Sequence, residues 1–92
     1  MAYYINKEKE NKEKKYFPAD YPNFKIIKTF TKPRSPRTKI FATDDPEGWF
    51  IDLFSIKSKT REVVNNEGWI TKKDIPNWVT WYESLGWIEK KT

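Results

Sequence analysis

Cations, prolines and hydroxyl groups are concentrated in one short stretch of the sequence, PRSPRTK at residues 33–39. Prolines stiffen such a segment, so its arginine and lysine side chains lose little freedom when they contact phosphate groups. Ser35 and Thr38 add two hydroxyl groups that are open to phosphorylation. The alternative is a solvated turn whose cations and prolines keep a sheet edge from pairing with another chain. We take the stretch as the first candidate contact for a polyanion.

Other lysines of the same region extend this candidate site. The predicted nucleic-acid-binding set is Lys25, Lys28, Lys32, Arg34, Arg37 and Lys39. If these cations share one face, Tyr21, Phe30 or Phe41 would be close enough to stack on unpaired bases, as in proteins that bind single strands. The alternative for each of these three aromatic residues is a place in the hydrophobic core.

The distribution of charge also directs attention to the N-terminal half. The 92 residues carry a formal net charge of +5. Residues 1–40 contain 11 Lys and Arg against 4 Asp and Glu, whereas residues 41–92 contain 7 against 9. Such an asymmetry is typical of a chain that contacts a polyanion with one part of its surface.

Carboxylates form a second cluster in TDDPEG at residues 43–48, with Asp52 close by in the sequence. Carboxylate oxygens are the ligands that Mg²⁺ and Ca²⁺ prefer, and a two-metal nuclease would use such a cluster. Asp-Pro and Glu-Gly are also ordinary turn sequences, and the spacing of an EF-hand is absent. We therefore interpret the segment as a structural turn and predict no metal site and no cofactor.

The chain contains neither cysteine nor histidine. Disulfides, thiolate or imidazole metal ligands, and nucleophile–base pairs that need these residues are excluded. We therefore expect a protein that is not an enzyme, and the sequence implies no small-molecule substrate. No apolar run approaches the roughly 20 residues of a membrane-spanning helix, and the N-terminus lacks the apolar segment of a signal peptide. These features predict a cytoplasmic protein with no membrane partner.

The apolar pattern predicts strands that pair as two hairpins. Each strand segment is rich in β-branched and aromatic residues. The expected strands cover residues 24–31, 38–42, 48–57 and 60–64. Phe24, Ile26 and Phe30 are expected to share one face of the first strand, and the 48–57 strand is apolar on both faces, as in a central strand covered twice. NNEG at 65–68 is expected to be a turn before a short extended segment at 69–71.

One helix is predicted near the C-terminus. Asp74 is expected to cap it, with proline tolerated in the first turn. Gly86 is expected to end it in a left-handed conformation, so that Trp87 folds back onto Tyr82 in a Schellman motif. A last short strand is expected after the helix. The buried stripe of the helix is expected to consist of Ile75, Trp78, Val79, Tyr82 and Leu85.

The order of these elements predicts an α+β fold. A small antiparallel sheet of two hairpins, about four or five strands, is expected to pack against the one C-terminal amphipathic helix. We assign residues 16–92 to this single domain and residues 1–15 to a charged N-terminal tail, flexible or a marginal helix. The proline-containing segment at 16–24 is expected to be an extended lid on the core, with an aromatic binding platform as the alternative.

Three Gly-Trp pairs punctuate the chain at 48–49, 68–69 and 86–87. Each glycine is expected to supply a turn conformation, and each tryptophan to anchor the next segment in the core. Trp81 falls beside the helix stripe and is the predicted partner-binding residue, since tryptophan is enriched at interface hot spots. The alternative is that all tryptophans of the last quarter pack between helix and sheet, namely Trp69, Trp78, Trp81 and Trp87.

Two functional hypotheses follow. The first is a small, basic, non-enzymatic protein that binds nucleic acid, DNA or RNA, by placing the basic hairpin and the tail on phosphates. The second is a protein-interaction module, for example a phage-type inhibitor or regulator that binds a host protein. A carboxylate–metal enzyme is a third reading, carried only by the acidic turn.

Overall fold

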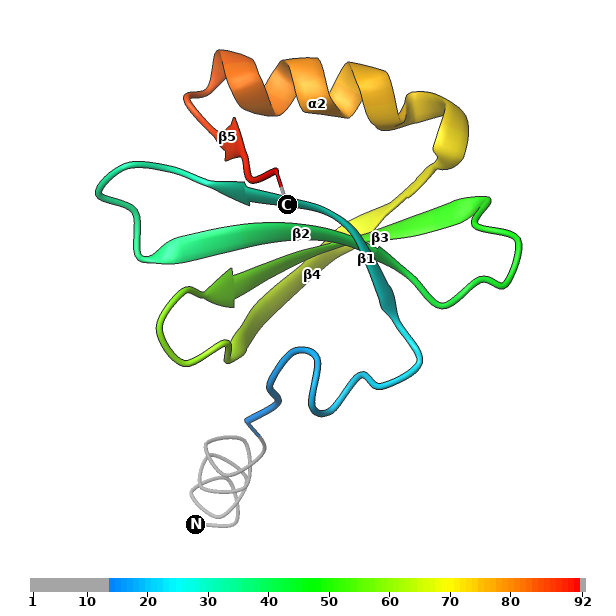
Figure 1. Cartoon of the computed structure of the whole chain (residues 1–92), viewed down its shortest axis with the longest axis horizontal. Coiled ribbons are helices and arrows are strands. Elements are labelled where there is room, and N and C mark those ends of the chain that lie inside the picture. Colours follow the sequence, from blue (N-terminus) through cyan, green and yellow to red (C-terminus); the bar gives the residue numbers. More distant parts are fainter. Residues whose placement is uncertain (1–13, 92) are drawn as a thin grey trace, which may run out of the picture.

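Five antiparallel strands form one sheet, and a helix packs on it, in a computed structural model that describes residues 14–91 (Figure 1). The predicted α+β fold is thus confirmed, whereas most of the predicted tail at 1–15 lies outside the described residues. The strands are β1 (Lys25–Thr31), β2 (Arg37–Thr43), β3 (Phe50–Lys57), β4 (Val63–Thr71) and β5 (Ile88–Glu89). A 3₁₀ turn, η1 (Lys72–Asp74), leads into α2 (Ile75–Ser84) between β4 and β5.

The sheet order is β4-β3-β2-β1-β5, so the first four strands follow one another as a meander. After α2 the chain returns to the β1 edge, where β5 pairs with Phe30 and Thr31. In an antiparallel meander, successive loops lie at opposite ends of the sheet. The β1–β2 and β3–β4 loops therefore share one end, and the β2–β3 loop lies at the other.

β4 is longer than the sequence predicts, because NNEG at 65–68 is part of the strand and not a turn. Two shifts of register between β3 and β4 accommodate the segment. Gly68 has φ +124°, and its N–H donates to the Asn66 Oδ1 at 3.0 Å. Pairing with β3 therefore overrides the local turn preference of Asn and Gly. That preference remains visible only as an irregularity within the strand.

The helix covers one face of the sheet. Tyr82 is buried there against Phe30 and Phe41, with ring centroids 5.2 and 5.4 Å away. Ile51, Leu53 and Ile70 complete this first core, and the partly buried residues packed on it are Ile75, Trp78, Val79 and Trp87. The predicted stripe is therefore confirmed except for Leu85, which is 45% exposed.

The two ends of α2 differ in how well they match the prediction. Asp74 occupies the N-cap position, but its side chain makes no cap bond; it accepts instead from the Thr71 hydroxyl at 3.0 Å. At the other end, the N–H of Gly86 donates to the carbonyl of Glu83 at 3.1 Å and that of Trp87 to Tyr82 at 3.0 Å. These two bonds, with φ +96° at Gly86, confirm the Schellman ending.

The segment at 16–24 is the predicted lid and covers the opposite face, but it is a series of turns and not the extended segment that the sequence predicts. Phe17 is buried, and the Phe54 ring of β3 lies 5.1 to 5.3 Å from the rings of Phe17, Tyr21 and Phe24. Arg61 holds this lid from the β3–β4 loop, because its Nε donates to the Phe17 carbonyl at 2.8 Å. The second core also contains Ile40, Ala42, Ile56 and the partly buried Val63.

The prediction that three apolar residues share one face of the first strand is wrong. Phe24, Ile26 and Phe30 do not share a face, because a bulge between Ile26 and Lys28 reverses the alternation along β1. Phe30 belongs to the helix-side core and Phe24 to the lid-side core, whereas Ile26 is exposed.

The expectation that every Gly-Trp tryptophan anchors the core also fails. Trp49 and Trp69 are 49% and 63% exposed. Trp69 pairs with Asp52 across β3 and β4, and its ring meets that of Phe50 at 5.4 Å. Because the neighbouring pair Ile51 and Ile70 faces the helix, the alternation of the strand directs Trp69 to the other face, beyond the lid.

Phe54→Ala should lower the free energy of unfolding by about 3–5 kcal/mol, because it removes a ring that the lid and the sheet enclose. Trp69→Ala removes a larger but mostly exposed ring and should cost about 1 kcal/mol or less. Urea denaturation of both variants measures the difference. Equal losses would contradict the two-sided core.

Candidate nucleic-acid interface

Two loops lie side by side at one end of the sheet. The β1–β2 loop spans residues 32–36 and the β3–β4 loop spans 58–62. The N–H of Ser58 donates to the Pro36 carbonyl at 2.9 Å, and the hydroxyl groups of Ser58 and Thr38 are 2.7 Å apart. Direct hydrogen bonds therefore hold the two loops together, although they are more than 20 residues apart in the sequence.

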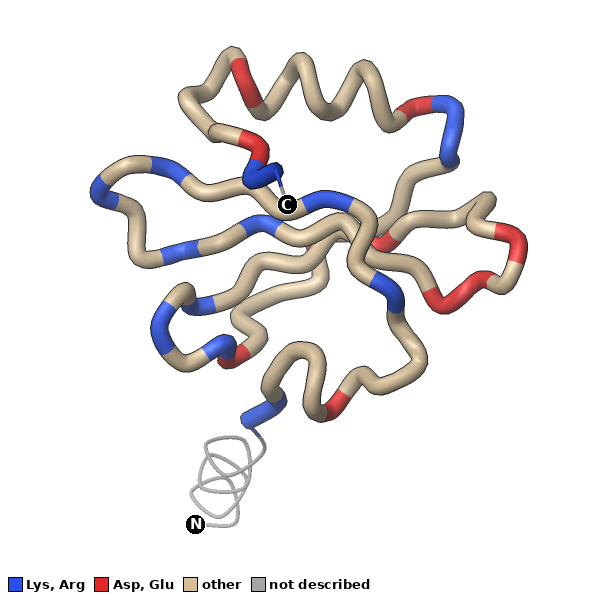
Figure 2. The backbone as a smooth tube through the Cα atoms, in the orientation of Figure 1, with Lys and Arg blue, Asp and Glu red and all other residues tan. Residues whose placement is uncertain are grey.

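Both loops and their flanking strand residues are rich in cations. Figure 2 shows lysine and arginine gathered on the two loops at this end of the sheet. We call this group the cationic end; it consists of Lys32, Arg34, Arg37, Lys57, Lys59 and Arg61. Arg37 and Lys57 are direct partners in the register of β2 and β3. Like charges placed opposite each other destabilise a sheet, so folding alone does not favour this pair.

Each loop also contains an arginine with positive φ, 68° at Arg34 and 65° at Arg61. This left-handed region is uncommon for residues other than glycine and asparagine. Arg61 has a structural role there, because it donates to the lid. Arg34 is exposed, and none of the ion pairs found within residues 14–91 involves it or Lys59. Lys57 lies 3.3 Å from Glu62 and is partly neutralised.

The structure divides the six predicted cations among four places. Lys32, Arg34 and Arg37 belong to the cationic end. Lys28 pairs with Glu89 of β5 at 2.9 Å. Lys39 donates to both carboxylate oxygens of Glu67, at 2.8 and 2.9 Å.

Lys25 lies at the far end of β1, opposite Thr43. There it lines a depression together with Asp44 and Glu47 of the β2–β3 loop. The expected single basic face is therefore wrong. Two strand lysines have acidic partners, and Lys25 lies at the other end of the sheet.

The aromatic residues expected beside the cations are not available for stacking. Phe30 and Phe41 have no exposed surface, and the ring of Tyr21 packs in the lid-side core. Their place in the core, which was the alternative, is confirmed.

Sequence reasoning missed Lys57, Lys59 and Arg61 as members of the same site. The signal was present as KSKTR at 57–61, a polar turn with three cations. The predicted hairpins already placed this turn at the end of a strand. Only the meander order, which puts it beside residues 32–36, unites the two turns.

The acidic loop between β2 and β3 is a structural turn, as predicted. Asp45 accepts hydrogen bonds from the N–H groups of Glu47 and Trp49 at 3.0 Å and of Phe50 at 3.4 Å. These bonds, that of Glu47 foremost, hold the pKa of the Asp45 carboxyl below its ordinary value. Within residues 14–91, no group of three or more acidic side chains is arranged to hold a metal ion.

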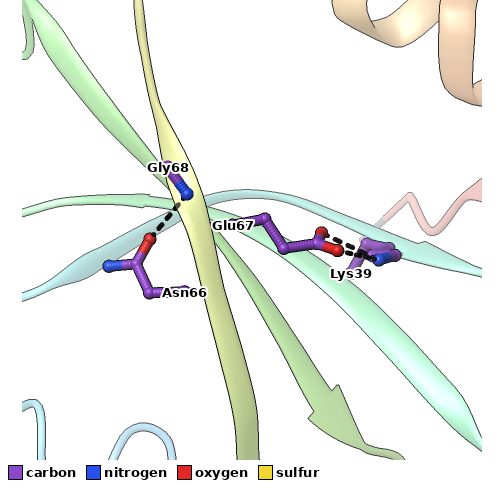
Figure 3. A network of polar contacts seen from close by, with 4 residues as sticks. All are labelled: Lys39, Asn66, Glu67 and Gly68. Carbon is purple, nitrogen blue, oxygen red and sulfur yellow. Dashed lines mark hydrogen bonds and ion pairs between the residues drawn. The ribbon is translucent and has the colours of Figure 1, made fainter.

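A groove between α2 and the sheet lies on the helix side. It has a volume of about 340 Å³, and we call it the tryptophan groove; its lining includes Trp78, Trp81, Leu85 and Trp87 with Lys39 and Glu67. Trp81 is 56% exposed, so the interpretation that all four tryptophans of the last quarter are core residues is wrong. Figure 3 shows Glu67 directed from β4 toward Lys39, while Asn66 lies on the other side of the strand.

The groove and the cationic end meet at Trp87. The ammonium groups of Lys32 and Lys39 lie 5.8 and 5.6 Å from the centre of its ring, within the range of cation–π attraction. Burial, and then the nearby charge of Glu67, raise the pKa of the Tyr82 hydroxyl to about 12.

No protein-family model, curated protein or solved structure matches this chain. In the part of the chain from residue 14 to residue 91, no helix is both long enough and apolar enough to cross a membrane.

The raised pKa of Tyr82 predicts a loss of stability at high pH. An unfolded tyrosine ionises near pH 10, so between pH 10 and 12 the unfolded chain releases this proton before the folded chain does. The free energy of unfolding should therefore fall more steeply over this window in the wild type than in Tyr82→Phe. Urea midpoints at pH 8.5 and pH 11 measure the difference. Parallel curves would show that Tyr82 does not carry this dependence.

Proposed function

We propose that this protein binds nucleic acid through phosphate contacts at the cationic end, as a non-enzymatic cytoplasmic protein. The observation that carries the proposal is the hydrogen-bonded pair of loops that brings six cations to one end of the sheet. Phosphates along a nucleic-acid backbone attract such clusters, and binding releases the counterions of the polyanion. Side chains with no acidic partner within residues 14–91, such as Arg34 and Lys59, retain their full charge for this contact.

The opposite end of the sheet supports an oriented approach. Asp44, Asp45 and Glu47 lie on the β2–β3 loop, away from the cationic end (Figure 2). A molecule that is more positive at one end than at the other is oriented by the field of a polyanion, because the more cationic end is attracted more strongly. The phosphate backbone should therefore meet the two cationic loops first.

A protein partner is the second candidate, favoured by the exposure of Trp81 and Leu85 side by side on the groove. Buried tryptophan is a frequent hot spot of protein interfaces. This reading includes a phage-type regulator that docks on a host protein. It predicts one saturable partner whose capture survives nuclease treatment.

Replacing Arg34 and Arg37 together by glutamine should weaken binding to duplex DNA and to single strands of any sequence. Glutamine removes the charge while keeping a long polar side chain. The slope of log affinity against log salt concentration should decrease in magnitude by about 2 for duplex DNA. Each cation that is removed leaves the protein neutralising one phosphate fewer. Fluorescence anisotropy with labelled oligonucleotides between about 50 and 200 mM salt measures both quantities.

The matched control is Lys72→Gln with Lys73→Gln. It removes the same charge from two exposed lysines of η1, which follows the end of β4 opposite the cationic loops. Its affinity should stay close to that of the wild type. If both double variants weaken binding equally, net charge and not the cationic end determines affinity. If the wild type does not bind at about 50 mM salt, the proposal fails.

Lys59 and Lys25 distinguish the interface seen in the structure from the face predicted by sequence. Lys59→Gln should lower affinity and reduce the salt slope by about 1, because Lys59 belongs to the cationic end. Lys25→Gln should change affinity little, since Lys25 lies beside the acidic loop. The same anisotropy titrations test the pair. A larger effect at Lys25 would favour the face predicted by sequence.

A further inference from the structure

We propose that the tryptophan groove binds an unpaired base, so that the protein prefers single-stranded nucleic acid over duplex. This inference rests on the proposed function, because the phosphate contacts at the cationic end would deliver the base. It assigns a ligand class to Trp81, Trp87 and the ion pair between Lys39 and Glu67, none of which the phosphate contacts require.

The walls of the groove are flat and aromatic. Trp81 and Leu85 stand exposed at its rim, while Trp78 and Trp87 are partly buried. Every base has a π face that can stack on an aromatic ring, so stacking of this kind binds single strands with little dependence on their sequence. The walls alone would also suit other apolar groups, so the polar groups of the groove decide among ligands.

The ion pair in the groove selects an uncharged polar ligand. Lys39 donates to both oxygens of Glu67, and the two side chains retain only 16% and 34% of their exposure. Their opposite charges cancel, so the groove offers a phosphate group no net attraction and presents it with a carboxylate. An alkyl chain would cover both charged groups without satisfying their remaining hydrogen bonds, which is costly. A nucleobase carries donors and acceptors at its edge and is uncharged, so it satisfies both requirements.

The position of the groove connects it to the phosphate contacts. Trp87 lines the groove, and the ammonium of Lys32, from the β1–β2 loop, lies over its ring at 5.8 Å. The chain thus places a cation of the phosphate-binding loop next to the aromatic wall. A strand whose phosphates contact this loop has its bases within reach of the groove. In a duplex these bases are paired and stacked inside the helix, and the groove stays empty.

Trp81→Ala tests the inference, measured with a labelled oligothymidine strand and with a duplex of the same length. Affinity for the single strand should fall by about 5-fold to 150-fold, the range that corresponds to the loss of stacking on one base. Affinity for the duplex should not change. Trp81→Phe, which keeps an aromatic face, should recover part of the single-strand affinity. Because Trp81 is mostly exposed, urea unfolding should show all three proteins folded.

Trp69→Ala is the matched control, since it removes another exposed tryptophan on the face away from the groove. It should bind both nucleic acids as the wild type does. If Trp81→Ala binds the single strand normally while Arg34→Gln with Arg37→Gln does not, the base site is wrong and the phosphate interface stands. Equal losses on single strand and duplex would also overturn the base site. If the wild type binds neither nucleic acid, both proposals are overturned.

Discussion

Burial of β3 on both faces is the constraint on which the rest of the structure depends. Ile51 and Leu53 face the helix-side core, while Phe54 and Ile56 face the core beneath the lid. A sheet that must be covered twice needs two separate coverings, and a chain this short supplies them from its two flanks. The helix follows the meander and the lid precedes it, so each core joins the sheet to a segment from one end of the described chain.

This arrangement also fixes where the charges are. With β2 and β3 as neighbouring inner strands of a meander, the turns before β2 and after β3 must lie at the same end of the sheet, and the turn between β2 and β3 must lie at the other end. Cations in the first two turns and carboxylates in the third therefore give the sheet a polarity along its strands. The same topology brings the end of α2 beside the β1–β2 loop, because β5 must return to the edge of β1. Topology, more than any local motif, assembles the cationic end and the groove beside it.

Local patterns predicted what local forces determine. The helix stripe, the glycine at its end and the basic turn at 32–37 each depend on residues within a few positions of one another, and all three are present. Lys28 and its partner Glu89 are 61 positions apart in the sequence, and Lys39 and its partner Glu67 are 28 positions apart. No local pattern reveals pairs at such separations. The turn predicted at NNEG is wrong for a related reason, because strand pairing at long range outweighed the local turn preference. The bulge in β1 likewise placed Phe30 on the opposite face of the sheet from Phe24.

The cationic end contains several features that work against folding. Arg37 faces Lys57 across two strands, and two arginines occupy a backbone region that glycine adopts with less strain. Arg61 is explained by its hydrogen bond to the lid, but Arg34 makes no ion pair among residues 14–91. Local violations of this kind gather where function imposes a requirement that folding does not. Asparagine at position 34 and a carboxylate opposite Arg37 would relieve both costs, and both changes would remove positive charge from one place. The arrangement therefore keeps charge at the expense of stability, as the proposed polyanion contact would require.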